Sequence, residues 1–349
     1  MLPIIQGQQT PRQARVSGLP VHVGAPDGKQ LVAAPPAPAQ SGRRPTRPGD
    51  SNAHPRHSPA LDSLHGLVLG DAFGDQWLAL SVDEAQARYA ARELCPAPWG
   101  WTDDSAMALV LVRHLAEYGE VHQDVLARGF AAGYAADPER GYGPSMHRVL
   151  RAIGEGGDWR AVTSELFGGQ GSHGNGAAMR VAPLGAWLAA DLDRVAEQAR
   201  LSAETTHFHV EAAAGAVAVA LAAALAARSR GTAAPERPDF LLQVAELLPD
   251  GDVRSGLRIA ARMPAGTSVR HAAAVLGSGY RLSAPDTVPF ALWAAAGHLD
   301  DLPEAIWTCL GGWGDTDTTC AITAGVVAAR TGLGGVPEHW LTARETFPV

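Results

Sequence analysis

Two short clusters of acidic and hydroxyl side chains, about two hundred residues apart, place the strongest constraint on how this chain folds. The first is Thr102–Ser105 and the second is Asp315–Thr319. Each cluster stands immediately before an apolar pattern of helical spacing, and these patterns close near Gly119 and Gly332. The clusters are therefore predicted to lie at the entries to two helices, where neighbouring carboxylates can converge instead of pointing about 100° apart.

Helix capping alone is a sufficient explanation for one such cluster. Thr and Asp are favoured N-caps, and acids in the first turn complement the helix dipole. If the two clusters meet, however, four carboxylates come together and require a compensating cation. Oxygen-only ligation of this kind suits magnesium, manganese or calcium rather than zinc. The pattern therefore leaves open two separate caps or one shared cation site.

From Leu61 onward the chain alternates Ala- and Leu-rich helical patterns with Gly- and Pro-marked loops, and no run of alternating β-branched residues indicates a sheet. An all-α domain is predicted over residues 61–349. Its most apolar run, residues 212–227, is short for a membrane span and is predicted to be a core helix. A looser, Pro-containing segment is expected between Arg228 and Pro238.

Residues 1–60 have a different composition. They contain no Phe, Tyr, Trp or Cys, and hold eleven of the 25 prolines and seven Lys/Arg against two Asp/Glu. Such a segment buries too little apolar surface to offset chain ordering, so it is predicted to be a disordered tail. The net charge of −8 argues against a broad basic nucleic-acid surface. Three scattered cysteines and no secretory signal favour reduced thiols in a cytoplasmic protein.

The two acidic clusters, in this order, resemble the metal-binding motifs of the ADP-ribosylglycohydrolase family. That family includes the dinitrogenase reductase-activating glycohydrolases and the ADP-ribosyl-acceptor hydrolases. Three more stretches agree: residues 66–75 resemble its first helix, residues 174–183 its central glycine-rich motif, and residues 202–207 the segment that supplies a substrate-facing His. The five motifs follow the family's order from about residue 62 to 340.

The resemblance implies a compact orthogonal multi-helix bundle with metal-dependent hydrolase activity. The reaction would remove ADP-ribose from a modified protein, nucleic acid or small molecule, reversing mono-ADP-ribosylation. Two divalent cations, Mg²⁺ or Mn²⁺, would act as cofactors, with ligands Thr102, Asp103, Asp104, Asp315, Asp317 and Thr318. Asp104 and Asp317 would also be catalytic, with Asp317 bridging the ions. We expect a monomer with no membrane and no stable nucleic-acid partner.

A glycine-rich segment, residues 171–176, is the predicted substrate cradle. Glycines let main-chain N–H groups approach an anion closely, and a following helix would add its positive end. The resemblance assigns the diphosphate and ribose to this segment and its surroundings, through Gly174, Asn175, Gly176, Met179 and His207. The alternatives are an ordinary glycine turn and a histidine that caps a helix or lies in the core. Arg180 would reach a phosphate or form a buried ion pair.

The loop over residues 137–143 is a second candidate for substrate contact. It is rich in turn residues and carries one arginine and one aromatic residue, Tyr142. Such a loop could cover a nucleotide, with Tyr142 as the stacking face. A plain connection between two helices accounts for it equally well.

The first helix departs from the family pattern at Leu78, where many relatives have a Glu four residues beyond the second glycine. Asp71 and Asp75 share one face of this helix, and Asp75 is the candidate catalytic substitute. The alternative is that the two acids cap a helix or hydrogen-bond a neighbouring loop, and Asp71 is the one expected to hold a loop in place. Two other functions stay open: a non-catalytic ADP-ribose binder or structural homologue, which the missing Glu favours, and a metal-dependent nucleotide phosphohydrolase.

Overall fold

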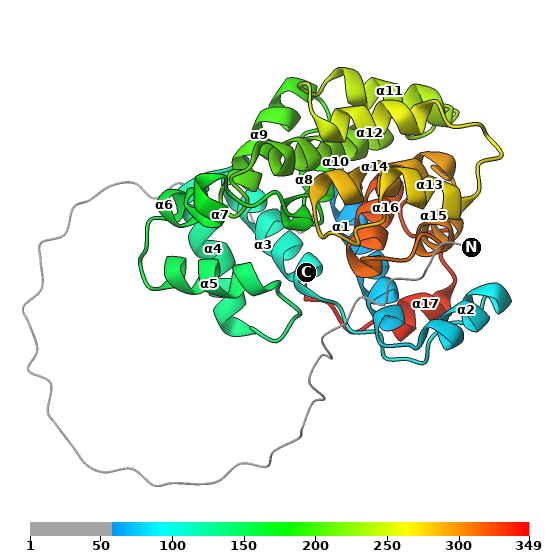
Figure 1. Cartoon of the computed structure of the whole chain (residues 1–349), viewed down its shortest axis with the longest axis horizontal. Helices are drawn as coiled ribbons and strands as arrows, with labels where there is room; N and C mark the ends of the chain where they lie inside the picture. Colours follow the sequence, from blue (N-terminus) through cyan, green and yellow to red (C-terminus); the bar gives the residue numbers. More distant parts are fainter. Residues whose placement is uncertain (1–57, 349) are drawn as a thin grey trace, which may run out of the picture. The chain divides into compact units, whose positions relative to one another are not determined.

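The structure is a computed structural model that describes residues 58–348 (Figure 1). These residues form helices and loops without a strand, and two isolated bridges join Trp99 to Arg344 and Gly174 to Ser283. The predicted all-α class is confirmed. The predicted tail falls almost wholly outside the described residues. Its last three positions belong to the first helix, which begins at Ser58 rather than at Leu61.

The helices follow one another through short loops. In chain order they are α1 (Ser58–Leu78), α2 (Val82–Ala91), α3 (Asp103–Tyr118), α4 (Gln123–Ala136), α5 (Pro144–Gly154), α6 (Trp159–Ser164), α7 (Leu166–Gly169), the 3₁₀ turn η2 (Asn175–Ala177), α8 (Ala182–Trp187), α9 (Leu192–Glu204), α10 (Val210–Arg228), α11 (Arg237–Glu246), α12 (Asp252–Ala261), α13 (Val269–Leu276), α14 (Ala284–Gly297), α15 (Leu302–Leu310), α16 (Thr316–Thr331) and α17 (Glu338–Ala343).

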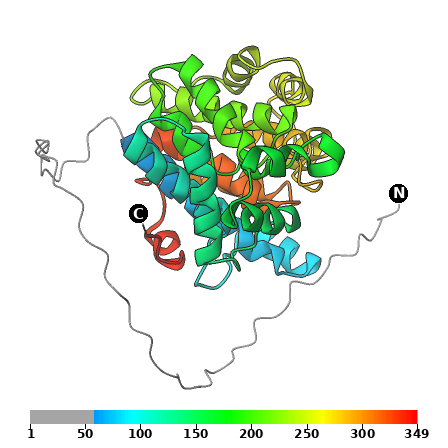
Figure 2. The same cartoon turned by 90° about the vertical axis from the view of Figure 1, so that its left-hand side faces the viewer.

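Helices α1 and α16 form the closest pair, and both views place them side by side at the centre of the helical part (Figure 2). Three glycines on one face of α1 make this approach possible. A Cβ at Gly70 would stand 2.2 Å from the carbonyl oxygen of Cys320, and one at Gly74 would stand 2.2 Å from that of Thr316. Gly66 lies against Ala324, farther along α16, so the two helices run antiparallel. Only glycine allows main chains to pack at this distance.

Helix α10 is the predicted core helix. It is long and apolar enough to cross a membrane by length and composition, but 72% of its apolar window is buried inside the protein. Helices α8, α9, α14 and α16 surround it. Its many alanines permit the close approach of α8, whose Gly185 has no room for a side chain against Ala220. The loop expected after Arg228 runs to the start of α11 at Arg237.

Both acidic clusters lie at helix entries, as predicted. Thr102 is the N-cap of α3, which ends at Gly119 in the left-handed conformation, with φ of 74°. Asp315 precedes α16, which ends at Gly332 with φ of 64°. The antiparallel pairing brings the entry of α16 beside the second half of α1, which also contacts α3.

Substituting Gly70 by Ala tests the α1–α16 contact. The added methyl group would collide with the main chain at Cys320, so we expect Gly70→Ala to destabilise the protein by about 1–3 kcal/mol or more. Urea denaturation measures the change. Gly154→Ala, in α5, is the control, because its added Cβ meets only Ala131 at an ordinary 3.8 Å. Equal stability of the two variants would show that α1 and α16 can move apart without cost.

Candidate active site

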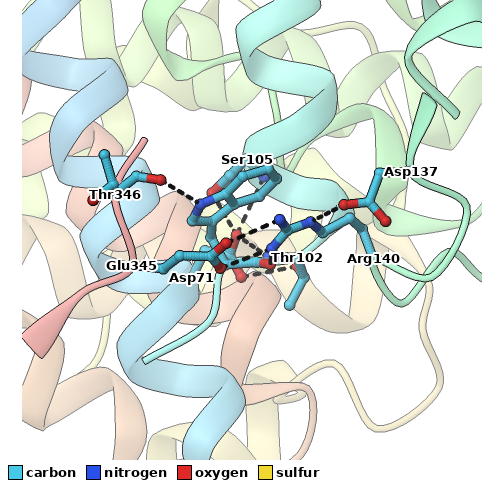
Figure 3. A network of polar contacts seen from close by, with 8 residues as sticks. Asp71, Thr102, Ser105, Asp137, Arg140, Glu345 and Thr346 are labelled. Atoms are coloured by element: carbon cyan, nitrogen blue, oxygen red, sulfur yellow. Dashed lines mark hydrogen bonds and ion pairs between the residues drawn. The ribbon is translucent and has the colours of Figure 1, made fainter. Parts of the chain in front are cut away.

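Asp71, in the middle of α1, anchors the first acidic cluster (Figure 3). Its carboxylate accepts hydrogen bonds from the main-chain N–H and the hydroxyl of Thr102, both at 2.8 Å. It also accepts from the N–H of Ser105 at 3.2 Å and from the Ser105 hydroxyl. The loop-holding role expected for Asp71 is thus observed, and the loop it holds is the entry of α3.

The second cluster is attached to α1 and to the glycine-rich segment. The Thr316 hydroxyl donates to the carbonyl of Gly74 at 2.9 Å. The amide of Asn175 donates to Asp315 at 2.7 Å and to the Thr287 hydroxyl at 3.0 Å. Asp315 stands at the N-cap of α16 but makes no side-chain capping hydrogen bond. Capping therefore does not explain its carboxylate, whereas Thr102 does cap α3 by accepting from the N–H of Asp104.

The acids of the two clusters influence one another across the site. Burial raises the pKa of Asp104 well above its usual range, and the charges of Asp71 and Asp317 raise it further. Burial raises the pKa of Asp317 in the same way, with contributions from Asp315 and Asp75. For Asp71, burial raises the pKa to about 7 against hydrogen bonds that lower it. These shared effects indicate one acidic site rather than two independent caps.

Two features of this site fit a cation. Burial and the nearby charge of Asp315 raise the pKa of Asp317, and a positive ion would relieve this repulsion between the two carboxylates. The buried Oδ1 of Asp104 has no hydrogen-bond partner. Within residues 58–348, however, no three His, Cys, Asp or Glu side chains are already arranged to hold a metal ion. The predicted ligand set, with its threonine hydroxyls, stays a prediction.

The glycine-rich segment packs against the ring of His207. The His207 ring fills the space where side chains of Gly174 and Gly176 would be, with ring atoms 3.2 and 2.7 Å from the Cβ positions. Burial lowers the pKa of His207 to about 3, so the ring is neutral, and the Thr206 hydroxyl lies 2.8 Å from its Nδ1. The segment continues into the three-residue turn η2, so a long helix does not supply the expected positive end.

Arg180 lies beneath the same segment, next to the buried Met179. Its guanidinium donates to the carbonyls of Ser202 at 2.9 Å and Gly176 at 3.4 Å, and stands 4.2 Å from the ring centre of Phe130. Burial lowers the pKa of Arg180 to about 9, against the nearby charge of Asp103, which raises it. The arginine supports the main chain of the loop from within. Its reach to a phosphate or its pairing with a carboxylate stays a prediction.

Tyr142 lies against the first cluster. It is 5% exposed, its ring meets Tyr134 edge-on at 5.0 Å, and burial together with the charge of Asp103 raises the pKa of its phenol. Its predicted stacking on a nucleotide stays a prediction. Its ring packs against Tyr134 and His147, within the electrostatic range of Asp103.

Leu78 and Asp75 differ in their exposure and in their position relative to the acidic site. Leu78, where relatives have a Glu, ends α1 and is 39% exposed. Asp75 is half-buried and close enough to Asp317 to raise the pKa of that carboxyl. The acid nearest to the site on this part of α1 is therefore Asp75.

A separate cavity of about 580 Å³ lies between the entries of α11 and α15, and none of the predicted site residues lines it. Sequence reasoning placed Asp71 against a neighbouring loop, but it missed the contacts of Arg140, which join segments far apart in the chain. The spacing of the sequence offers no signal for these contacts.

Comparisons with known proteins agree with this arrangement. A family model described as ADP-ribosylglycohydrolase matches residues 52–347. The ADP-ribosylhydrolase ARH3 of Xenopus tropicalis is 31% identical over 277 residues, covering 71% of this chain and 78% of the relative. The human ARH3 is 29% identical, covering 81% and 88%. A solved structure titled ADP-ribosylglycohydrolase-related protein complex shares the fold, with a TM-score of 0.57, 24% identity, and coverage of 83% and 93%.

The family match spans nearly the whole described domain and includes all five motifs. The two acidic clusters meet at one site in the structure, and Asn175 bonds the glycine-rich segment to the second cluster at Asp315. The chain belongs to the ADP-ribosylglycohydrolase family.

Proposed function

We propose that this protein is a metal-dependent hydrolase that cleaves the glycosidic bond between ADP-ribose and a modified acceptor, reversing mono-ADP-ribosylation. The observation that carries the proposal is the single acidic site, in which Asp104 retains an unpartnered buried oxygen and Asp315 is bonded to the glycine-rich segment. The ARH3 relatives, named as ADP-ribosylhydrolases, support the same linkage. An ADP-ribosylated protein, nucleic acid or small molecule in the cytoplasm is the proposed substrate.

The acidic residues would hold two divalent cations, Mg²⁺ or Mn²⁺. The proposed ligands are Thr102, Asp103, Asp104, Asp315, Asp317 and Thr318. When bound, such ions supply charge that orients ribose hydroxyls and makes a water molecule a better nucleophile. The Thr102 hydroxyl donates its hydrogen bond to Asp71 and accepts one from the Asp104 N–H, which leaves one lone pair of the Thr102 oxygen for a cation.

The remaining residues would bind and activate the substrate. The main chain at Gly174 and Gly176, which carries no side chain, would lie against the diphosphate, over the neutral ring of His207. Cleavage at the anomeric carbon passes through an oxocarbenium-like state. Asp75, beside Asp317, would donate a proton to the leaving group or orient the attacking water.

Release of ADP-ribose tests this function directly. With defined ADP-ribosylated substrates on arginine, serine and a nucleic-acid base, we expect hydrolysis with Mg²⁺ or Mn²⁺ and its loss after chelation. Free ADP-ribose is the second substrate, because a nucleotide phosphohydrolase would cleave its diphosphate and release AMP. Calorimetric binding of ADP-ribose without turnover of any substrate would support the non-catalytic alternative, for which the exposed Leu78 is the favouring observation.

The buried acids predict an unusual pH dependence of stability. Their pKa values are raised in the folded protein, so the contribution they make to stability at low pH is lost as pH rises from about 4. For Asp71 the loss extends through about pH 7. We expect the melting temperature of chelated protein to fall from pH 5 to pH 8, and Mg²⁺ to restore it at pH 8.

The variant Asp104→Asn tests whether the charges of the buried acids, rather than a general loss of stability, cause this pH dependence. Removing one buried charge should raise the melting temperature of the chelated protein at pH 8 and reduce its response to Mg²⁺. A variant that melts below wild type and keeps the full Mg²⁺ response would show that Asp104 is structural.

Asp75→Asn tests the proposed replacement for the missing Glu. Loss of general acid/base help is typically worth ~10²–10⁴-fold in kcat. We expect a decrease of that size in single-turnover release of ADP-ribose, with calorimetric binding of ADP-ribose nearly unchanged. Asp83→Asn, an exposed acid in the first turn of α2, is the control. A wild-type rate in Asp75→Asn would assign the acid role elsewhere.

A further inference from the structure

Arg140 is the most connected side chain near the first acidic cluster, and Figure 3 shows its surroundings. Its guanidinium bonds Glu345 through two nitrogens, at 2.8 and 3.0 Å, and Asp137 at 2.7 Å. It also donates to the carbonyl of Trp101 at 3.1 Å and lies 3.4 Å from the centre of the Trp101 ring. These bonds use four of its five N–H groups, so Arg140 is committed to the protein rather than to a nucleotide.

The main chain of Arg140 completes the arrangement. Its carbonyl accepts a hydrogen bond of 2.8 Å from the N–H of Asp103. Arg140 therefore forms hydrogen bonds with the main chain on both sides of Thr102. Its side chain bonds Trp101, and its own main chain bonds Asp103. Thr102 itself is tied to Asp71 from the opposite side.

The segment over residues 343–347 holds Glu345 beside Arg140. Trp99 donates its N–H to Ala343 at 2.7 Å, and Glu345 donates its own to Trp99 at 2.8 Å. Farther along, the Trp101 indole N–H bonds the carbonyl of Thr346 at 3.4 Å and its ring meets Phe347 edge-on. Main-chain pairing thus fixes the position of Glu345 independently of the contact between its side chain and Arg140.

We propose that the Arg140–Glu345 pair is a clamp that positions the first acidic cluster, and that both residues are positioning residues of the site. The clamp links residues 343–347, the loop over 137–143 and the entry of α3, so that loosening it lets Thr102 and Asp103 move. Its effect on cation binding rests on the proposed function; its effect on the main chain at Asp103 does not. The 137–143 loop, considered above as a nucleotide cover, then serves as a support behind the ligands.

The chain contains a matched control pair. Arg92 bonds Glu304 through two nitrogens, at 2.6 and 2.7 Å, and its guanidinium lies 5.4 Å from the ring centre of Trp307. This pair has the same chemistry but joins the end of α2 to α15. Gln keeps the size of Glu and one hydrogen-bonding oxygen, so neither Glu345→Gln, in the partly buried pair, nor Glu304→Gln, in the more exposed one, is expected to unfold the protein.

Hydrogen exchange at the Asp103 amide, measured in full-length Glu345→Gln and Glu304→Gln, tests the clamp without reference to activity. We expect exchange roughly tenfold faster in Glu345→Gln and unchanged in Glu304→Gln. Arg140→Lys, which keeps the charge but not the two-nitrogen bond, should also accelerate exchange. Equal exchange in wild type, Glu345→Gln and Arg140→Lys would overturn the proposal.

Mn²⁺ titration tests the consequence for the site. Residues that orient ligands typically change metal affinity by roughly 10–100-fold. We expect weaker Mn²⁺ binding of about that size in Glu345→Gln, and recovery of kcat at saturating Mn²⁺, which a general loss of structure would not give. Wild-type Mn²⁺ affinity in Glu345→Gln despite faster exchange would overturn the positioning role. Absence of cation-dependent hydrolysis in the wild type would instead refute the proposed function and leave the exchange result standing.

Discussion

The close approach of α1 to α16 is the contact on which the site depends. Three glycines spaced four apart on α1 remove the side chains that would otherwise separate the two main chains. With α16 this near, the Thr316 hydroxyl reaches the carbonyl of Gly74, and the acid at Asp317 comes within the electrostatic range of Asp71 and Asp75. A wider spacing would leave two helix entries with separate solvated acids.

Because the two helices lie so close, carboxylates are buried beside one another, and hydrogen bonds offset only part of their charge. Asp71 receives several hydrogen bonds, and Asn175 offsets part of the charge on Asp315. Asp104 and Asp317 remain buried beside other carboxylates, with pKa values well above the ordinary range. Two nearby arginines are engaged elsewhere, since Arg180 bonds main-chain carbonyls and Arg140 pairs with Glu345. The raised pKa values mean that the acids either hold protons or are matched by a positive ion, a condition that favours binding a cation.

Local sequence patterns predicted the positions of several helices. Helical spacing and glycine stops located α3 and α16, and the apolar run of α10 identified a core helix, because these features depend on residues close together in the chain. Composition could not indicate which helices meet, so the union of the two clusters required the family resemblance. The surroundings of Arg140 were beyond prediction, since its partner Glu345 lies 205 positions away. The buried state of Tyr142 likewise follows from packing with Tyr134, which no spacing reveals.

The pairing of the first described helix with one near the end of the chain has a consequence for synthesis. A nascent chain that has emerged only through α15 carries α1, α3 and the glycine-rich segment, but lacks Asp315 and Asp317. Its glycine face on α1 has no partner, and the acids at the entry of α3 stand without their counterparts. Contacts across such a long sequence separation are slow to form, because a large loop must close first. The acidic site therefore cannot form before α16 has been synthesised and packs onto α1.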